Sequence, residues 1–176
     1  WETPARHKAT LMTAAHMAAF IVLTRDKFGG KVILDKDGYP VVDYRLADYD
    51  RRHMFVGMKK AFELHRAAGA KEITFPHSTA RTYKVQTSKM SAEAWLEQMP
   101  GWGWKANQFA LFTAHQMGTC AMGADAARHP VDPSGQVRGV KGLFVADGSL
   151  MPTSAGINPM MTIAALADWV VRGMIG

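Results

Sequence analysis

The chain has 176 residues, of which 48% are hydrophobic and 20% are charged, the balance of an ordinary globular protein with one sizeable core. Its net charge is +6, but its 21 lysines and arginines are scattered, which predicts a solvated surface and no nucleic-acid partner. The single cysteine, Cys120, excludes an internal disulfide framework and fits a reducing compartment.

The N-terminal part of the chain predicts a helical lead-in, a strand and a hairpin. Residues 20–24 are apolar and β-branched, which favours a strand. Residues 31–35 and 39–44 also look like strands, and the pair Asp37-Gly38 lies between them. Asp-Gly between two such runs is a strong signal for a tight turn, so we expect an antiparallel hairpin.

A helix is predicted over residues 48–68, because Met54, Met58 and Ala61 recur at the spacing of one helix face. Gly69 is well placed to end it. His65 continues the apolar stripe, so we interpret it as a core histidine and not as a catalyst.

The middle of the chain predicts short elements around loops. A returning strand is expected at residues 71–75, followed by a polar loop over residues 76–88 in which His77 has no evident partner. Ser91 is placed to cap a short helix. The stretch Trp102-Gly103-Trp104 favours either packing under a loop or a wall of an apolar substrate pocket.

Two elements are expected near the C-terminus. Residues 143–146 form an apolar run of the kind found in buried strands, and its end can be a ligand site or a plain turn. Asn158 is a good N-cap residue, and Pro159 is favoured at the first helical position. Residues 160–175 are apolar on nearly every face but shorter than the roughly 20 residues of a membrane span, which predicts a buried core helix.

Three motifs follow one another in the last third of the chain. They are His115-x-x-Gly118-Thr119-Cys120-x-Met122-Gly123, Val137-x-Gly139-Val140-x-Gly142-Leu143-x-Val145-x-Asp147-x-Ser149 and Asn158-Pro159-x-x-Thr162-Ile163. In this order and spacing they resemble the C-terminal signature of the glucose–methanol–choline (GMC) family of FAD-dependent oxidoreductases. The residues around His115 are most similar to the long-chain alcohol oxidase branch.

The resemblance implies an α+β chain from the α/β flavoprotein family. Residues 1–108 would be part of an antiparallel-sheet substrate-binding domain with helices. Residues 109–176 would be the C-terminal return segment of the FAD-binding domain, a strand and a buried helix. The family's G-x-G-x-x-G fingerprint is missing from the sequence. We therefore expect a C-terminal piece, or one part of a split enzyme, whose partner is the N-terminal FAD-binding portion with its Rossmann fold.

The resemblance also implies roles for individual residues. His115 would be the base that takes the hydroxyl proton of an alcohol, a task that suits imidazole near neutral pH. Asn158 would be the second catalytic residue and would bind the substrate oxygen. The residues expected to hold the flavin are Asp147, Gly148, Asn158, Pro159, Met160 and Met161. A metal site is not expected, because His115 and Cys120 have no further ligands at suitable spacing.

The expected activity is oxidation of a primary, apolar or long-chain alcohol to an aldehyde, with FAD as cofactor and O₂ or another electron acceptor. A sterol, sugar or choline-like alcohol is an alternative substrate. The alternative of another class is a basic, non-enzymatic α+β module that binds a polyanion through Arg51, Arg52, Lys59 and Lys60. No transmembrane span is predicted, and we expect a cytoplasmic or peripherally membrane-associated protein in preference to a secreted one.

Overall fold

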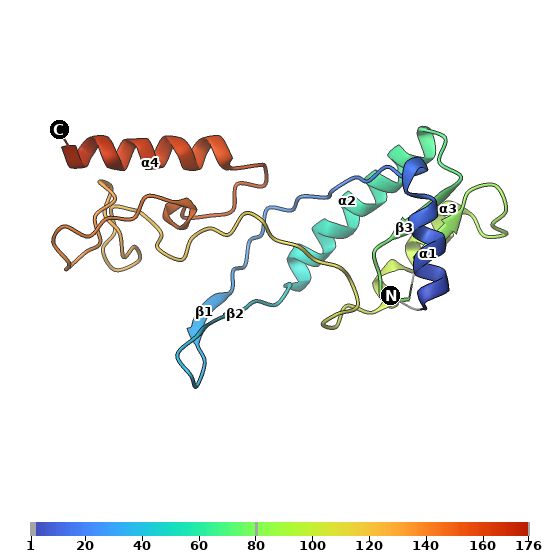
Figure 1. Ribbon diagram of the computed structural model, residues 1–176, viewed down its shortest axis with the longest axis horizontal. Coiled ribbons are helices and arrows are strands. Elements are labelled where there is room, and N and C mark those ends of the chain that lie inside the picture. The colour runs from blue at the N-terminus through green and yellow to red at the C-terminus, as the bar shows by residue number, and fades with distance from the viewer. Residues whose placement is uncertain (1–2, 80, 176) are drawn as a thin grey trace. The chain divides into compact units, whose positions relative to one another are not determined.

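The computed structural model describes residues 3–79 and 81–175 (Figure 1). Contacts within the chain divide it into two compact units, each of them discontinuous in sequence. Unit 1 combines Trp1–Val22 with His53–Phe112, and unit 2 combines Leu23–Arg52 with Thr113–Gly176. The predicted division into residues 1–108 and 109–176 concerns family domains and not contact clusters, so it stays a prediction.

Unit 1 consists of helices and one small sheet. Its elements are α1 (Pro4–Met12), the 3₁₀ helix η1 (Ala14–His16), α2 (Asp48–Ala67, whose first turn belongs to unit 2), β3 (Glu72–Phe75), β4 (Arg81–Lys84), α3 (Ala92–Glu97) and the 3₁₀ helix η2 (Met99–Trp102). The prediction that Gly69 ends the long helix is confirmed, because Gly69 follows α2 with a φ of +85°. The cap predicted at Ser91 is also confirmed, since its hydroxyl accepts the Ala94 N–H at 3.1 Å.

β4 lies within residues 76–88, where the sequence predicts a polar loop. It pairs antiparallel with β3, and Ile73 lies opposite Tyr83. The prediction of a loop over residues 76–88 is therefore wrong. β4 buries only Tyr83 and has a charged residue at each end, so its sequence lacks the apolar run that marks a strand.

Aromatic side chains form much of the core of unit 1. Phe62 of α2 is fully buried, and its ring centroid lies 5.4 Å from that of Tyr83. Trp102 is buried in the same cluster, and Trp104 stacks on Phe109 at 4.1 Å. For Trp102-Gly103-Trp104 the structure favours packing under a loop over a pocket wall.

His77 has partners that the sequence does not reveal. Its side chain is buried, its Nδ1 accepts the Thr79 N–H at 3.1 Å, and its ring lies 4.8 Å from that of Phe109. Because Nδ1 accepts a hydrogen bond, the proton of the neutral ring is on Nε2, which lies 3.4 Å from the Gly103 carbonyl oxygen. His77 therefore ties the end of β3 to the loop after η2.

Unit 2 contains a hairpin and a helix joined by long loops. Its elements are β1 (Lys31–Leu34), β2 (Pro40–Asp43), the 3₁₀ helix η3 (Gly148–Leu150) and α4 (Met160–Ile175). The predicted hairpin is confirmed: β1 pairs antiparallel with β2, and Gly38 in the turn has a φ of +84°. Both strands are exposed along their whole length.

α4 lies where a helix is predicted, but it does not have the predicted burial. Val170 packs with Val131 and Leu150 in a small core, and the Trp169 indole donates to the Pro133 carbonyl oxygen at 3.3 Å. The other faces are open to solvent, with Trp169 64% exposed and Ile175 82% exposed. The prediction of a buried helix is wrong for this chain, because the loops of unit 2 cover only one side of a helix that is apolar on several.

Two of the predicted strands are also absent. Residues 20–24 have no regular secondary structure, and residues 143–146 contain only an isolated bridge from Phe144 to Gln136. Backbone bonds such as Val137 N–H to the Leu143 carbonyl oxygen, at 2.8 Å, tie the second segment to a loop. Side-chain preference alone does not make a strand, since a strand also needs a regular neighbour to pair with.

With helices and two separate antiparallel pairs, the described part of the chain is α+β, as predicted. Within the same described ranges, no helix has the length and apolar character needed to span a membrane.

Candidate active site

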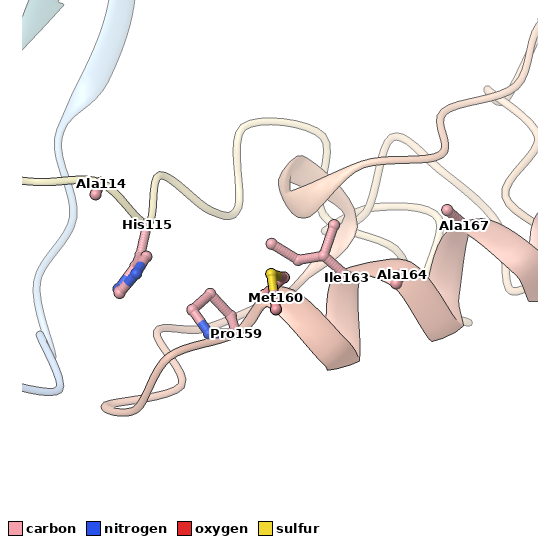
Figure 2. Close-up of a pocket in the computed structure, with 7 residues that line it drawn as sticks. All are labelled: Ala114, His115, Pro159, Met160, Ile163, Ala164 and Ala167. Atoms are coloured by element: carbon pink, nitrogen blue, oxygen red, sulfur yellow. The ribbon is translucent and has the colours of Figure 1, made fainter.

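An open pocket in unit 2 lies between His115 and the start of α4 (Figure 2). The pocket has a volume of about 410 Å³. Its lining residues come from one loop and from the beginning of the helix, and they are Ala114, His115, Pro159, Met160, Ile163, Ala164 and Ala167. The structure therefore groups three of the predicted site residues, His115, Pro159 and Met160, around one space.

The loop that carries His115 is held along η3. The Cys120 N–H donates to the Ser149 carbonyl oxygen at 3.1 Å, and the Met122 N–H donates to that of Leu150 at 2.9 Å. Between His115 and these bonds the chain turns at Gly118, whose φ of +86° favours glycine. The first motif thus fixes the direction in which the chain approaches α4.

Gly148 lies where this loop, η3 and α4 meet. A Cβ on Gly148 would lie 3.2 Å from the Gln116 carbonyl oxygen and 3.0 Å from Cδ1 of Ile163. The absence of a side chain therefore lets residues 115–116 approach the first turn of the helix. Gly148 does not line the pocket, so packing explains this glycine without a ligand, and its predicted contact with flavin stays a prediction.

The Asp147 carboxylate is engaged locally. It accepts the hydroxyl of Ser149 at 2.5 Å and the N–H of the same residue at 2.8 Å, which caps η3. These two bonds, the hydroxyl first, lower the pKa of Asp147 below its usual value. Asp147 also lies outside the pocket lining, and its predicted role toward the flavin stays a prediction.

α4 begins one residue later than predicted. The Pro159 carbonyl oxygen accepts the Ile163 N–H at 2.9 Å, and the helix runs from Met160. Pro159 therefore occupies the N-cap position, and the prediction of Asn158 as N-cap with Pro159 as the first helical residue is wrong. Asn158 is instead an exposed residue just before the cap, so this helix start does not depend on its side chain.

The amides of Met160 and Met161 precede the first hydrogen bond inside α4, so the helix offers them no partner. Free N–H groups and the helix dipole favour negative charge at this point. Met160 lines the pocket with His115, whereas Asn158 and Met161 adjoin its lining without being part of it.

Four pocket residues were not identified from the sequence: Ala114, Ile163, Ala164 and Ala167. The last three have a signal that could have revealed them. Together with Met160 they follow the i, i+3, i+4, i+7 spacing of one helix face, so a ligand at the helix start also meets this face. Ala114 has no such signal beyond its place beside His115.

The sequence profile of a family described as GMC oxidoreductase matches residues 29–167 of this chain. The chain belongs to the GMC oxidoreductase family. The match includes the hairpin, the loop of His115 and the pocket face of α4. GMC oxidoreductases in general depend on FAD and oxidise alcohols.

Among curated relatives, this GMC oxidoreductase chain is similar to three long-chain-alcohol oxidases of Arabidopsis thaliana. It is 33% identical to FAO4A over 168 residues, 32% identical to FAO4B over 172 residues and 31% identical to FAO1 over 172 residues. Each alignment covers 95% of this chain. The chain spans only 23% of the length of FAO4A and 22% of the length of the other two.

The pocket residues of this GMC oxidoreductase fit the ring end of a flavin. They combine an apolar helix face, free N–H groups at a helix start and an imidazole side chain. A reduced flavin ring carries negative charge, and such N–H groups favour it. The nucleotide end of FAD requires a glycine-rich loop that this sequence does not contain.

Proposed function

We propose that this chain forms the catalytic face of an FAD-dependent oxidoreductase that converts a primary, apolar or long-chain alcohol to an aldehyde. The observation that carries the proposal is the pocket in which His115 faces the start of α4. Membership of the GMC family supplies the reaction class. The holoenzyme in this proposal is the chain assembled with an N-terminal FAD-binding portion.

His115 is the proposed base. An alcohol does not lose its hydroxyl proton at neutral pH, so a positioned imidazole must take that proton as the substrate is oxidised. The Asn158 amide is proposed to donate a hydrogen bond to the same oxygen and to hold it beside His115. FAD, when bound, supplies the two-electron acceptor for the hydride of the alcohol carbon.

The start of α4 is proposed to receive the ring of the cofactor. The amides of Met160 and Met161 would stabilise negative charge there, and the ring of Pro159 would help to close the pocket wall. Asp147 and Gly148 are proposed to support the same site from η3. O₂ or another oxidant would then reoxidise the cofactor.

The pocket lining supports an apolar substrate. Apart from His115, its side chains are those of alanine, isoleucine, methionine and proline, with no carboxylate for a cationic alcohol and no set of polar groups for the several hydroxyls of a sugar. The relatives named long-chain-alcohol oxidases agree with this preference. In a series of primary alcohols, we expect kcat/KM to rise with chain length and to exceed that for glucose or choline.

The His115→Ala variant of the holoenzyme tests the proposed base. Loss of a general base typically slows a reaction about 10²- to 10⁴-fold, so flavin reduction in stopped-flow absorbance should slow by that factor. FAD content should stay the same, because the imidazole acts on the substrate. His16→Ala, at an exposed histidine of unit 1, is the control and should reduce its flavin normally. A normal rate in His115→Ala would contradict the role given to His115.

A further inference from the structure

A segment near the N-terminus holds the loop that leads to the start of α4. The Arg25 Nε donates to the Ser154 carbonyl oxygen at 3.0 Å, across 129 residues of sequence. Gly156, two residues further on, packs against the same side chain. A Cβ on Gly156 would lie 2.8 Å from Cβ of Arg25, and its φ of +70° also favours glycine.

The segment that carries Arg25 is itself anchored inside unit 2. Asp50, in the first turn of α2, is 1% exposed and accepts the N–H groups of Lys27 at 2.9 Å and Phe28 at 3.3 Å. Asp26, the next residue after Arg25, accepts the Tyr44 hydroxyl at 2.9 Å through its carboxylate. Arg25 therefore extends from a segment that is held by the backbone N–H groups of Lys27 and Phe28 and by the side chain of Asp26.

The loop beyond Ser154 has few other supports before the helix. It passes through Gly156 and the exposed Ile157 and Asn158, and it ends at Pro159 in the pocket wall. No hydrogen bond other than that from Arg25 reaches the backbone of residues 154–158 within the described part of the chain. The position of Asn158 relative to His115 therefore depends on how residues 154–156 are held.

We propose that Arg25 is a positioning residue that holds the Ser154–Gly156 turn and thereby places Asn158 and Pro159 across the pocket from His115. This inference rests on the proposed function, because it assigns Arg25 to the geometry of that reaction. Arg25 touches neither the pocket nor the substrate. Its effect on rate comes from distance, since a misplacement of about 1 Å in a reacting geometry can cost roughly 100-fold.

Two substitutions of similar length separate the hydrogen bond from the bulk of the side chain. Arg25→Gln places an N–H donor the same number of bonds from the backbone as Nε, whereas Arg25→Met has a carbon there and no donor. In the holoenzyme, we expect Arg25→Met to slow flavin reduction roughly 10- to 100-fold and Arg25→Gln to recover most of that loss. KM for the alcohol should change less than kcat, because the apolar lining is untouched.

The matched control is Arg172→Met. Arg172 is also an exposed arginine of unit 2 whose Nε donates a hydrogen bond, but its partner is the Asp168 carboxylate on α4. The Arg172→Met holoenzyme should reduce its flavin at the normal rate. A second readout does not depend on activity: hydrogen exchange of the Ile163 amide, which donates to the Pro159 carbonyl oxygen at 2.9 Å, should become faster in Arg25→Met and remain unchanged in Arg25→Gln and Arg172→Met.

Gly156→Ala tests the same contact from the other side. Its new Cβ meets the Arg25 side chain, so Gly156→Ala alone should slow flavin reduction. In the double variant with Arg25→Met, the combined slowing should be smaller than the product of the two single slowing factors, because both substitutions disturb the same contact. Equal rates in Arg25→Met and Arg25→Gln, or unchanged hydrogen exchange, would overturn the role of Arg25. If instead His115→Ala reduces its flavin normally, the proposed function fails, whatever the Arg25 variants do.

Discussion

At the scale of single residues, some glycines and polar residues of the motifs lie at the pocket, whereas others only pack or hold the loops around it. Gly123, in the first motif, has no room for a side chain, because a Cβ there would lie 2.5 Å from the His129 ring. Arg138 then holds the carbonyl oxygens of Gly123 at 2.7 Å and His129 at 3.1 Å. A motif that identifies a family therefore includes residues that shape the loops around the site, and only some that face a ligand.

The proposed catalytic role of Asn158 can be tested by substitution without disturbing the start of α4. Because the Pro159 carbonyl begins the helix, Asn158→Ala should change the melting temperature little. If the amide donates to the substrate oxygen, flavin reduction in the holoenzyme should fall about 10²- to 10³-fold, the typical cost of losing one such donor. In Asn158→Asp the rate of flavin reduction should fall at least as far, because the carboxylate adds negative charge beside the substrate oxygen and the flavin, where negative charge develops.

The control for both Asn158 variants is FAD content, which is measured on the same samples and should equal that of the wild-type holoenzyme. Normal flavin reduction in Asn158→Ala would mean that the amide does not act on the substrate.

At the scale of elements, sequence patterns predicted the local structure and missed what depends on neighbours. The 3.6-residue period predicted α2, the apolar run after Pro159 predicted α4 to within one residue at its start, and Asp37-Gly38 predicted the hairpin, because each signal lies within one segment. β4 and the isolated bridge at Phe144 depend on partners elsewhere in the chain, which local patterns cannot encode. The family resemblance led us to expect His115 and Pro159 at one site, and the spacing of Ala164 and Ala167 from Met160 could have added them. Ala114 and the bond from Arg25 to Ser154 had no marker in the sequence.

Asp50 should be the most sensitive carboxylate among the elements of unit 2. Each oxygen of its carboxylate accepts one backbone N–H, from Lys27 and from Phe28. Asp50→Asn replaces one of these oxygens by an NH₂ group, which cannot accept, so one of the two N–H groups loses its acceptor. A fully buried donor without an acceptor costs about 1–3 kcal/mol, and these donors are partly buried, so the free energy of unfolding should fall by about 1 kcal/mol or more in urea titrations. Asp48→Asn, in the same helix turn but 72% exposed, should change it by less than about 1 kcal/mol. Equal stability of the two variants would contradict the anchoring role of Asp50.

At the scale of the whole chain, the open faces of α4 have a measurable consequence. Met160 and Met161 are 73% and 75% exposed, and Trp169 and Ile175 add further apolar surface. Contiguous exposed apolar surface promotes association. Expressed alone, the 176-residue chain should bind a hydrophobic dye, tend to aggregate and retain no FAD after gel filtration. A soluble chain that carries one FAD per molecule would contradict this prediction.

The discontinuity of unit 2 also bears on the order in which the molecule is made. Residues 23–52 leave the ribosome before residues 113–176, and the bond between Arg25 and Ser154 must close a loop of 129 residues. Long-range contacts form slowly, because the entropy of loop closure is lost before the contact contributes, and domains usually fold as they emerge. Residues 53–112 can therefore collapse during synthesis, while the hairpin segment waits for the C-terminal third. The pocket between His115 and the start of α4 can therefore form only after residues 159–167 have been synthesised, and its support from Arg25 closes over a longer stretch of chain than its own lining does.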